Sequence, residues 1–201
     1  IKVIPNNSEK YLSFSYKEYG MNKYGHKFIS HEVRFLDSFA FMASSLDSLS
    51  KNLTEDQFKL TKEYYKRIDS FNSYEEEFKL MKRKGIYPYE YMNSFKKYEE
   101  TDLPSKEMFY DELNGKDCSD EDYEYAKLVY KKLGCKNLGD YTEKYMINDV
   151  LMLADVFETF RKTCMNYYKL DPCWYYTAPG LAWDAMLKIT NVKLQTIKDY
   201  E

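Results

Sequence analysis

The sequence contains little glycine or proline and no long hydrophobic run. Only 7 Gly and 5 Pro occur in 201 residues, and because both residues interrupt regular elements, their scarcity favours long helices. No apolar stretch reaches the roughly 20 residues that a membrane-spanning helix needs, and no signal-peptide pattern is visible. We therefore expect no membrane partner.

Cysteine and histidine are too sparse and too scattered for a zinc site. The four cysteines form no Cys-x-x-Cys pair, and the two histidines, His26 and His31, lie far from all of them in the sequence. Zinc sites built from these residues need closely spaced ligand pairs. We expect free thiols in a reducing intracellular compartment, such as the nucleus or the cytoplasm of a host cell.

A basic excess is also missing. The chain has 30 Lys and Arg against 33 Asp and Glu, which gives a formal net charge of −3. Proteins that bind nucleic acids without sequence preference normally carry an excess of basic residues, because these neutralise phosphates. Any contact with nucleic acid must therefore come from a local patch or from parts of the protein outside this sequence.

The residues that are abundant form regular patterns. With 44% hydrophobic and 31% charged residues, including 22 Tyr and 12 Phe, the composition is that of a folded chain. Alternating apolar residues predict strands over 11–16 and 27–39, joined as an antiparallel hairpin. Helical patterns follow, so the sequence indicates half of an α/β or α+β domain, since a lone hairpin is only marginally stable.

Helix signals occupy most of the chain after residue 44. Hydroxyl side chains that can cap a helix precede three of the segments, namely Ser44 or Ser45, Thr54 and Ser119. The predicted helices cover about 46–53, 54–67, 73–83, 105–113, 119–134, 138–168 and 176–188, with an extended segment over 86–91. In the longest helix, an apolar stripe is predicted from Met146, Val150, Leu153, Phe157, Phe160 and Cys164.

Tyr145 and Asp149 are the pair that points most directly to chemistry. They lie four residues apart in the longest predicted helix, so both side chains share one helix face. A carboxylate can hold a hard cation and a neighbouring phenol can orient a water, which suits metal-assisted cleavage of a phosphodiester. The same spacing also arises by chance from one core-edge residue and one solvated acid.

Four separated passages resemble the protein-primed family B DNA polymerases of viruses and self-synthesising transposons, above all the Polinton/Maverick type. They are Arg-Phe-Leu-Asp-Ser-Phe at 34–39, Lys-Gly-Ile at 84–86 with Tyr89, Tyr-x-x-x-Asp at 145–149, and Tyr-Thr-Ala-Pro-Gly-Leu-Ala at 176–182. The resemblance extends over nearly the whole chain. It implies a partial ribonuclease-H-like 3′–5′ exonuclease domain over 1–170, with an N-terminal β-hairpin and a long C-terminal helix. Residues 171–201 would connect it to a polymerase domain.

The resemblance also implies a role for individual residues. Asp149 would be a ligand of Mg²⁺ or Mn²⁺, two of which act in the intact parent, and Tyr145 would align the attacking water. Lys84 would neutralise charge that develops on the phosphate. The residues that would seat the single-stranded 3′ end of DNA are Ser38, Phe39 and Tyr89. A terminal protein that primes replication is a further candidate partner.

Several motifs of the family do not occur between residues 1 and 201. The Asp-x-Glu motif, the Asn that precedes an aromatic-Asp pair, and the two polymerase palm motifs are absent, and we expect them in flanking sequence. The chain begins at Ile1 and has the character of an excerpt. It would carry one of four metal-binding carboxylates, and one carboxylate is insufficient for Mg²⁺, which dehydrates reluctantly. We expect the isolated chain to be inert.

Two other interpretations remain open. A catalytically dead, domesticated remnant would serve as a DNA- or protein-binding module. A structural helical protein would use none of these residues for chemistry. In that second case Lys84 complements a helix dipole, Tyr89 packs beside Pro88, Phe39 is buried, and the residues Ser38, Lys84 and Asp149 lie scattered in the fold.

Overall fold

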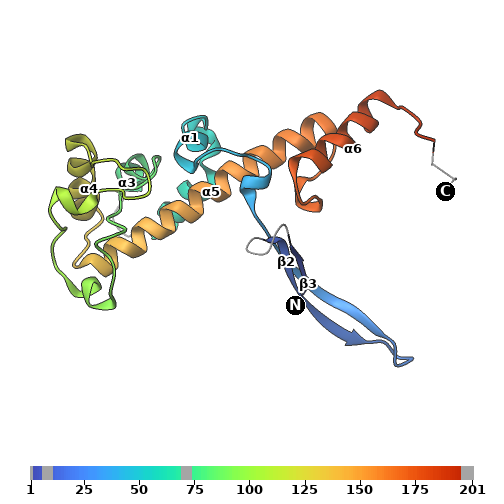
Figure 1. Ribbon diagram of the computed structural model, residues 1–201, viewed down its shortest axis with the longest axis horizontal. Helices are drawn as coiled ribbons and strands as arrows, with labels where there is room; N and C mark the ends of the chain where they lie inside the picture. Colours follow the sequence, from blue (N-terminus) through green and yellow to red (C-terminus); the bar gives the residue numbers. More distant parts are fainter. Residues whose placement is uncertain (1, 6–10, 69–73, 196–201) are drawn as a thin grey trace. The chain divides into compact units, whose positions relative to one another are not determined.

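The computed structural model describes residues 2–5, 11–68 and 74–195. The chain divides into two compact units. The sheet unit comprises Ile1–Ser44 with Phe160–Glu201, and the helical unit comprises Ser45–Thr159. Figure 1 colours the chain in sequence order. Strands and helices both occur, so the predicted α/β class is confirmed at this level.

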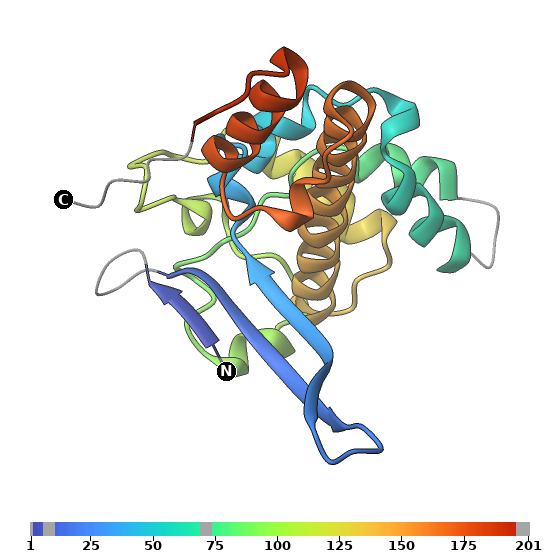
Figure 2. The same cartoon turned by 90° about the vertical axis from the view of Figure 1, so that its right-hand side faces the viewer.

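The sheet unit is built around a three-stranded antiparallel sheet in the order β1-β2-β3 (Figure 2). Its strands are β1 (Lys2–Pro5), β2 (Tyr11–Met21) and β3 (Lys27–Leu36). The predicted hairpin is confirmed, although β2 is longer than expected and β1 was not predicted. β3 ends at Leu36 rather than at residue 39, because the Asp37 side chain accepts a hydrogen bond from the backbone N–H of Phe39 and starts a 3-10 turn, η1 (Ser38–Ala40).

The strand register separates two faces of the sheet. Ser15 of β2 lies between Lys2 of β1 and Arg34 of β3, so these three side chains share one face. The neighbouring residues Phe14 and Phe35 pair on the opposite face, where their rings stack with centroids 4.4 Å apart. One face is therefore polar and charged near its centre, and the other is aromatic.

Two further elements complete the sheet unit after the end of α5 (Leu138–Tyr168). The 3-10 turn η5 (Pro172–Trp174) begins where Asp171 accepts a hydrogen bond from the Cys173 N–H at 3.0 Å. Helix α6 (Ala178–Thr190) follows and ends at Asn191, whose φ of 54° is left-handed. The helix predicted over 176–188 is thus confirmed with a shift of two residues at each end.

The helical unit consists of short helices that pack around the first part of α5. They are α1 (Leu46–Ser50), η2 (Glu55–Gln57), α2 (Lys59–Ile68), α3 (Tyr74–Leu80), η3 (Phe95–Glu99), η4 (Lys106–Phe109) and α4 (Asp120–Lys132). The side chains of Ser45 and Ser119 cap α1 and α4 as predicted. The expected start of α3 at Ser73 lies outside the described residues.

Two predicted helices of this unit differ from the structure. The segment 54–67 is divided at Phe58 into η2 and α2. The helix predicted over 105–113 is wrong beyond the short η4, because Asp111 instead accepts hydrogen bonds from the backbone and side chain of Asn114. Those bonds close a turn through Gly115, whose φ is 60°, and no helix can continue through it.

Helix α5 has the predicted bounds, but its buried face is not the predicted stripe. Met146, Val150 and Leu153 are exposed. The buried positions are Leu138, Tyr141, Asn148, Met152, Asp155 and Val156, which repeat at steps of three and four residues. Two of these residues are polar, and for that reason a stripe defined by apolar residues was placed on the wrong face.

The two buried polar residues of α5 have specific partners. Asn148 donates from Nδ2 to the Arg83 carbonyl at 3.0 Å. Asp155 accepts from the N–H groups of Leu60 and Thr61, at 2.8 and 3.0 Å, and from the Thr61 hydroxyl at 2.7 Å. It thereby satisfies the first N–H groups of α2, which have no partner inside that helix. Among the described residues, no helix combines the length and apolar character needed to cross a membrane.

Candidate functional site

The segment from Arg83 to Tyr89 lies along α5 in the helical unit. Hydrogen bonds from two α5 side chains fix it there: Asn148 donates to the Arg83 carbonyl at 3.0 Å, and the Tyr141 hydroxyl donates to the Ile86 carbonyl. The passage that contains Lys84 and Tyr89 is therefore held against the same stretch of α5 that carries Tyr145 and Asp149.

Tyr145 lies in a cluster of tyrosines. Its ring stacks on Tyr87 with centroids 4.7 Å apart and meets the edge of Tyr89 at 6.1 Å. The hydroxyl groups of Tyr145 and Tyr89 are hydrogen-bonded to each other. Gly85 makes this packing possible, since a Cβ at that position would lie 2.7 Å from Cδ2 of Tyr145, closer than carbon atoms can approach.

Asp149 is half-buried beside Tyr145. One carboxylate oxygen, Oδ1, is buried and has no hydrogen-bond partner among the described residues, while the carboxylate receives a hydrogen bond from the Tyr145 hydroxyl. Burial raises the pKa of Asp149, and the Tyr145 hydrogen bond and the charge of Lys84 partly oppose that rise. A buried acceptor without a partner is costly, so Oδ1 is the atom that a cation or an incoming donor would satisfy.

The tyrosine hydroxyl at this site is held in its neutral form. Burial raises the pKa of Tyr145, and the hydrogen bonds with Tyr89 and Asp149 raise it further. A neutral phenol can donate one hydrogen bond and accept others. Tyr145 can therefore orient a polar group near Asp149 but does not act as a base.

Lys84 lies within electrostatic reach of two acids, Asp149 and Asp111. It follows the last residue of α3, Leu80, by an irregular stretch, and it is half-buried rather than solvated. Lys84, Tyr89, Tyr145 and Asp149 are thus brought together, as expected if they act in one site.

Ser38 and Phe39 belong to the sheet unit, in the turn η1. The Ser38 carbonyl accepts backbone hydrogen bonds from Phe41 and Met42, both at 3.0 Å. The Phe39 side chain is 59% exposed, so its interpretation as a buried residue is wrong. An exposed phenylalanine at a strand end is available for contact with a ligand.

The residues present do not by themselves fit a divalent ion. The part of the chain that the structure describes contains no group of three His, Cys, Asp or Glu side chains that could hold a metal. Asp149 offers one carboxylate, whereas Mg²⁺ needs several fixed oxygen ligands. Any metal held at Asp149 would require carboxylates from outside this group.

Three residues of this site were not identified from the sequence: Gly85, Tyr87 and Asn148. Gly85 carried a usable signal, since it is an isolated glycine between a charged helix and an aromatic segment, a setting that favours close approach of another group. Tyr87 and Asn148 carried none, because both residue types are ordinary in helices and loops.

Comparison with protein-family models, with curated proteins and with solved structures gives no match to this chain.

Proposed function

We propose that this chain carries the third motif of a metal-dependent 3′–5′ exonuclease that belongs to a protein-primed family B DNA polymerase. The observation that supports this most is the meeting of two sequence passages at one place. Lys84 and Tyr89 come from one family-like passage, Tyr145 and Asp149 from another, and hydrogen bonds along α5 hold the two together. A structural protein with a chance Tyr-x-x-x-Asp spacing gives no reason for this.

Each residue of the site has a role that its environment suits. Asp149 presents a buried oxygen without a partner, which is the donor that a divalent ion requires. Tyr145, hydrogen-bonded to that carboxylate and kept neutral, would orient a water. Lys84 would place positive charge near a phosphate, where a preorganised cation stabilises negative charge that develops in the reaction. The metal, when bound, supplies Lewis-acid stabilisation of the phosphate oxygens.

The activity depends on carboxylates that this chain does not contribute. Since Asp149 is the one acid at the site, we expect the 201-residue chain to release no nucleotide from the 3′ end of single-stranded DNA with Mg²⁺ or Mn²⁺. Metal-dependent trimming by the purified chain that is lost in Asp149→Ala would contradict this expectation.

The decisive test uses the genomic sequence on both sides of the chain and the protein that it encodes. We expect an Asp-x-Glu motif upstream and two palm motifs downstream in one reading frame. In the protein made from that frame, Asp149→Ala should abolish 3′ trimming, and Tyr145→Phe should lower its rate by about 10- to 100-fold. DNA synthesis should persist in both variants.

Glu143→Ala is the matched control for these variants. Glu143 is an exposed acid on the same helix, α5, so its removal should leave 3′ trimming unchanged. Stop codons that interrupt the frame next to residues 1 and 201, together with retained binding of DNA, would instead identify a domesticated binding module. Equal loss of activity in Glu143→Ala and Asp149→Ala would remove the special role of Asp149.

A further inference from the structure

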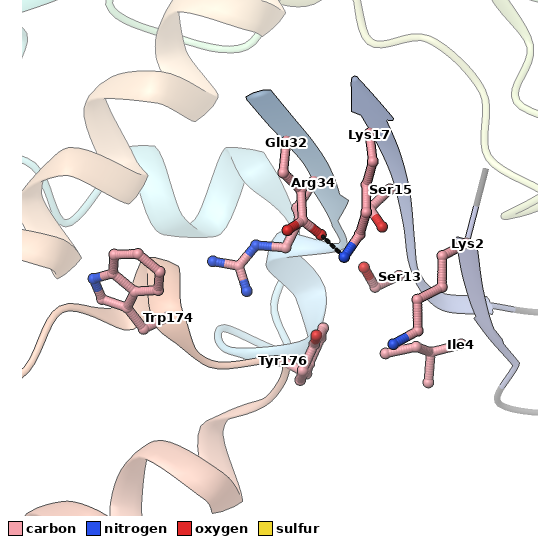
Figure 3. Close-up of a pocket in the computed structure, with 9 residues that line it drawn as sticks. All are labelled: Lys2, Ile4, Ser13, Ser15, Lys17, Glu32, Arg34, Trp174 and Tyr176. Carbon is pink, nitrogen blue, oxygen red and sulfur yellow. Dashed lines mark ion pairs between the residues drawn. The ribbon is translucent and has the colours of Figure 1, made fainter. Parts of the chain in front are cut away.

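The polar face of the sheet forms one wall of a hollow inside the sheet unit. The hollow has a volume of about 390 Å³, and alternate residues of the three strands line it together with Trp174 and Tyr176. In Figure 3 the side chains of Lys2, Lys17 and Arg34 surround an open space above Ser13. We name this hollow the cationic cup.

Arg34 connects the sheet with η5. Its guanidinium donates from Nη2 to the Cys173 carbonyl at 3.1 Å and lies 5.3 Å from the centre of the Trp174 ring. Trp174 is nevertheless 71% exposed. A large aromatic ring that is fixed in place and left open to solvent is a common element of binding sites.

The charge in the cup is predominantly positive. Lys17 pairs with Glu32 at 3.3 Å, and Glu32 is the one acid that lines the cup. Arg34 is bonded to a carbonyl rather than to a carboxylate, and within the described residues no ion pair joins Lys2 to an acid. Two cations of the cup are therefore not neutralised by carboxylates.

The rest of the sheet unit has the same sign. Its two segments contain 12 Lys and Arg against 8 Asp and Glu, a formal charge of +4 in a chain whose total is −3. A strand of nucleic acid is attracted to such a surface because its binding releases counterions from the phosphates.

We propose that the cationic cup binds a segment of single-stranded nucleic acid. Lys2 and Arg34 contact its phosphates, and one base stacks on the open part of Trp174. Proteins that bind single strands combine these two elements, a positive groove and aromatic platforms. An acidic peptide would satisfy the cations but would leave the exposed indole without a flat partner. The site involves no cleavage and none of the residues around Asp149, so it goes beyond the proposed nuclease.

The test uses the 201-residue chain with Trp183→Phe, so that Trp174 is the one remaining tryptophan. A ten-residue oligothymidylate with a fluorescent label reports affinity by anisotropy, and the same oligomer without label reports stacking by quenching of Trp174. We expect quenching that saturates with the binding isotherm. Arg34→Gln and Lys2→Gln should each weaken binding by about tenfold at low salt, and each should reduce the slope of log K against log salt by about one.

Lys23→Gln is the matched charge control. Lys23 is a cation of the same unit that lies in the hairpin turn and does not line the cup, so its loss should change affinity less than twofold. Trp174→Ala should weaken binding by about tenfold, and Trp174→Phe should recover most of that loss by restoring a stacking surface. Circular dichroism of each variant checks that the fold is retained.

Several results would overturn the proposal. Binding without quenching of Trp174, or equal weakening by Lys23→Gln and Arg34→Gln, would reduce it to non-specific attraction by charge. Polyglutamate that competes at matched charge would indicate a surface for acidic proteins. Oligouridylate that binds as well as oligothymidylate supports a single-strand site without preference for sugar. Because these assays measure binding alone, they can succeed when the proposed exonuclease fails, and the reverse.

Discussion

The sheet unit and the helical unit differ in the sign of their charge. The sheet unit has 12 basic and 8 acidic residues, and the helical unit has 18 basic and 25 acidic residues, so their formal charges are +4 and −7. The total of −3 conceals this division. An argument from net charge about binding to nucleic acid therefore applies to each unit separately, and it excludes much less than it does for the whole chain.

The units also use aromatic residues differently. In the helical unit, tyrosines serve the core, and their hydroxyls bond to backbone carbonyls: Tyr123 to Pro104 at 2.9 Å and Tyr125 to Leu80 at 2.6 Å. In the sheet unit, Phe14 and Trp174 are exposed. Buried tyrosines of the first kind stabilise a fold, whereas exposed rings of the second kind are available to a ligand or partner.

Asp155→Ala tests whether the helical unit depends on a polar core, and it should have the largest effect. The substitution removes the acceptor of three hydrogen bonds at the start of α2 and leaves buried donors unpaired. We expect a loss of about 3 kcal/mol in the free energy of unfolding, measured by urea denaturation. Glu143→Ala should change it by less than about 0.5 kcal/mol. Similar values for the two variants would contradict the role of Asp155.

Asp171→Asn tests the sheet unit in the same way. The Asp171 carboxylate receives two bonds from Nε of Arg161, at 2.9 and 3.0 Å, and one from Nη2 at 2.7 Å. The Arg161 guanidinium lowers the pKa of Asp171 to about 2. We expect a loss of about 2 kcal/mol at pH 7, with weaker binding of oligothymidylate because Asp171 also fixes the turn that holds Trp174.

The pH dependence of this effect has a definite sign. A pKa that is lowered in the folded state adds stability above the unfolded value of 3.8, and this stability is lost as the pH falls towards 2. The difference in unfolding free energy between the original chain and Asp171→Asn should therefore shrink over that range. Glu18→Gln, an exposed acid of the hairpin, should show no such trend. A difference that stays constant down to pH 2 would exclude the ion pair as its cause.

Asp149→Asn should have the smallest effect and the opposite sign. The pKa of Asp149 is raised by burial, so its stabilising contribution is complete below 3.8 and is lost as the pH rises through the folded value. A neutral amide avoids this loss, and we expect a gain of less than about 1 kcal/mol at pH 7 that disappears near pH 3. Thermal denaturation at both pH values measures it. Destabilisation at pH 7 would show that the charged form is favoured in the fold.

The sequence predicted those features that depend on neighbouring residues. The bounds of α5, the caps at Ser45 and Ser119, and the hairpin are all set by local patterns, and all three are confirmed. The helix over 105–113 failed because side-chain bonds of Asp111 outweigh helix propensity there. The buried face of α5 failed because Asn148 and Asp155 are buried through partners far away in the sequence.

The two candidate sites differ in the same respect. Tyr145, Asp149, Lys84 and Tyr89 were predicted from family-like motifs, and they lie together. The cationic cup was not predicted, because it requires the strand register that aligns Lys2 with Arg34 and the packing of Trp174 beside them. No pattern within one segment contains that information.

The hydrogen-bonded row of Tyr89, Tyr145 and Asp149 has a direction. Each phenol carries a single proton, so when Asp149 is ionised Tyr145 must point its proton to the acid, and Tyr89 must then donate to Tyr145. Protonation of Asp149 frees Tyr145 to reverse, and Tyr89 would then turn its own proton outward or receive one. The outermost phenol, which is exposed, would thus display on the surface whether the acid behind it is charged.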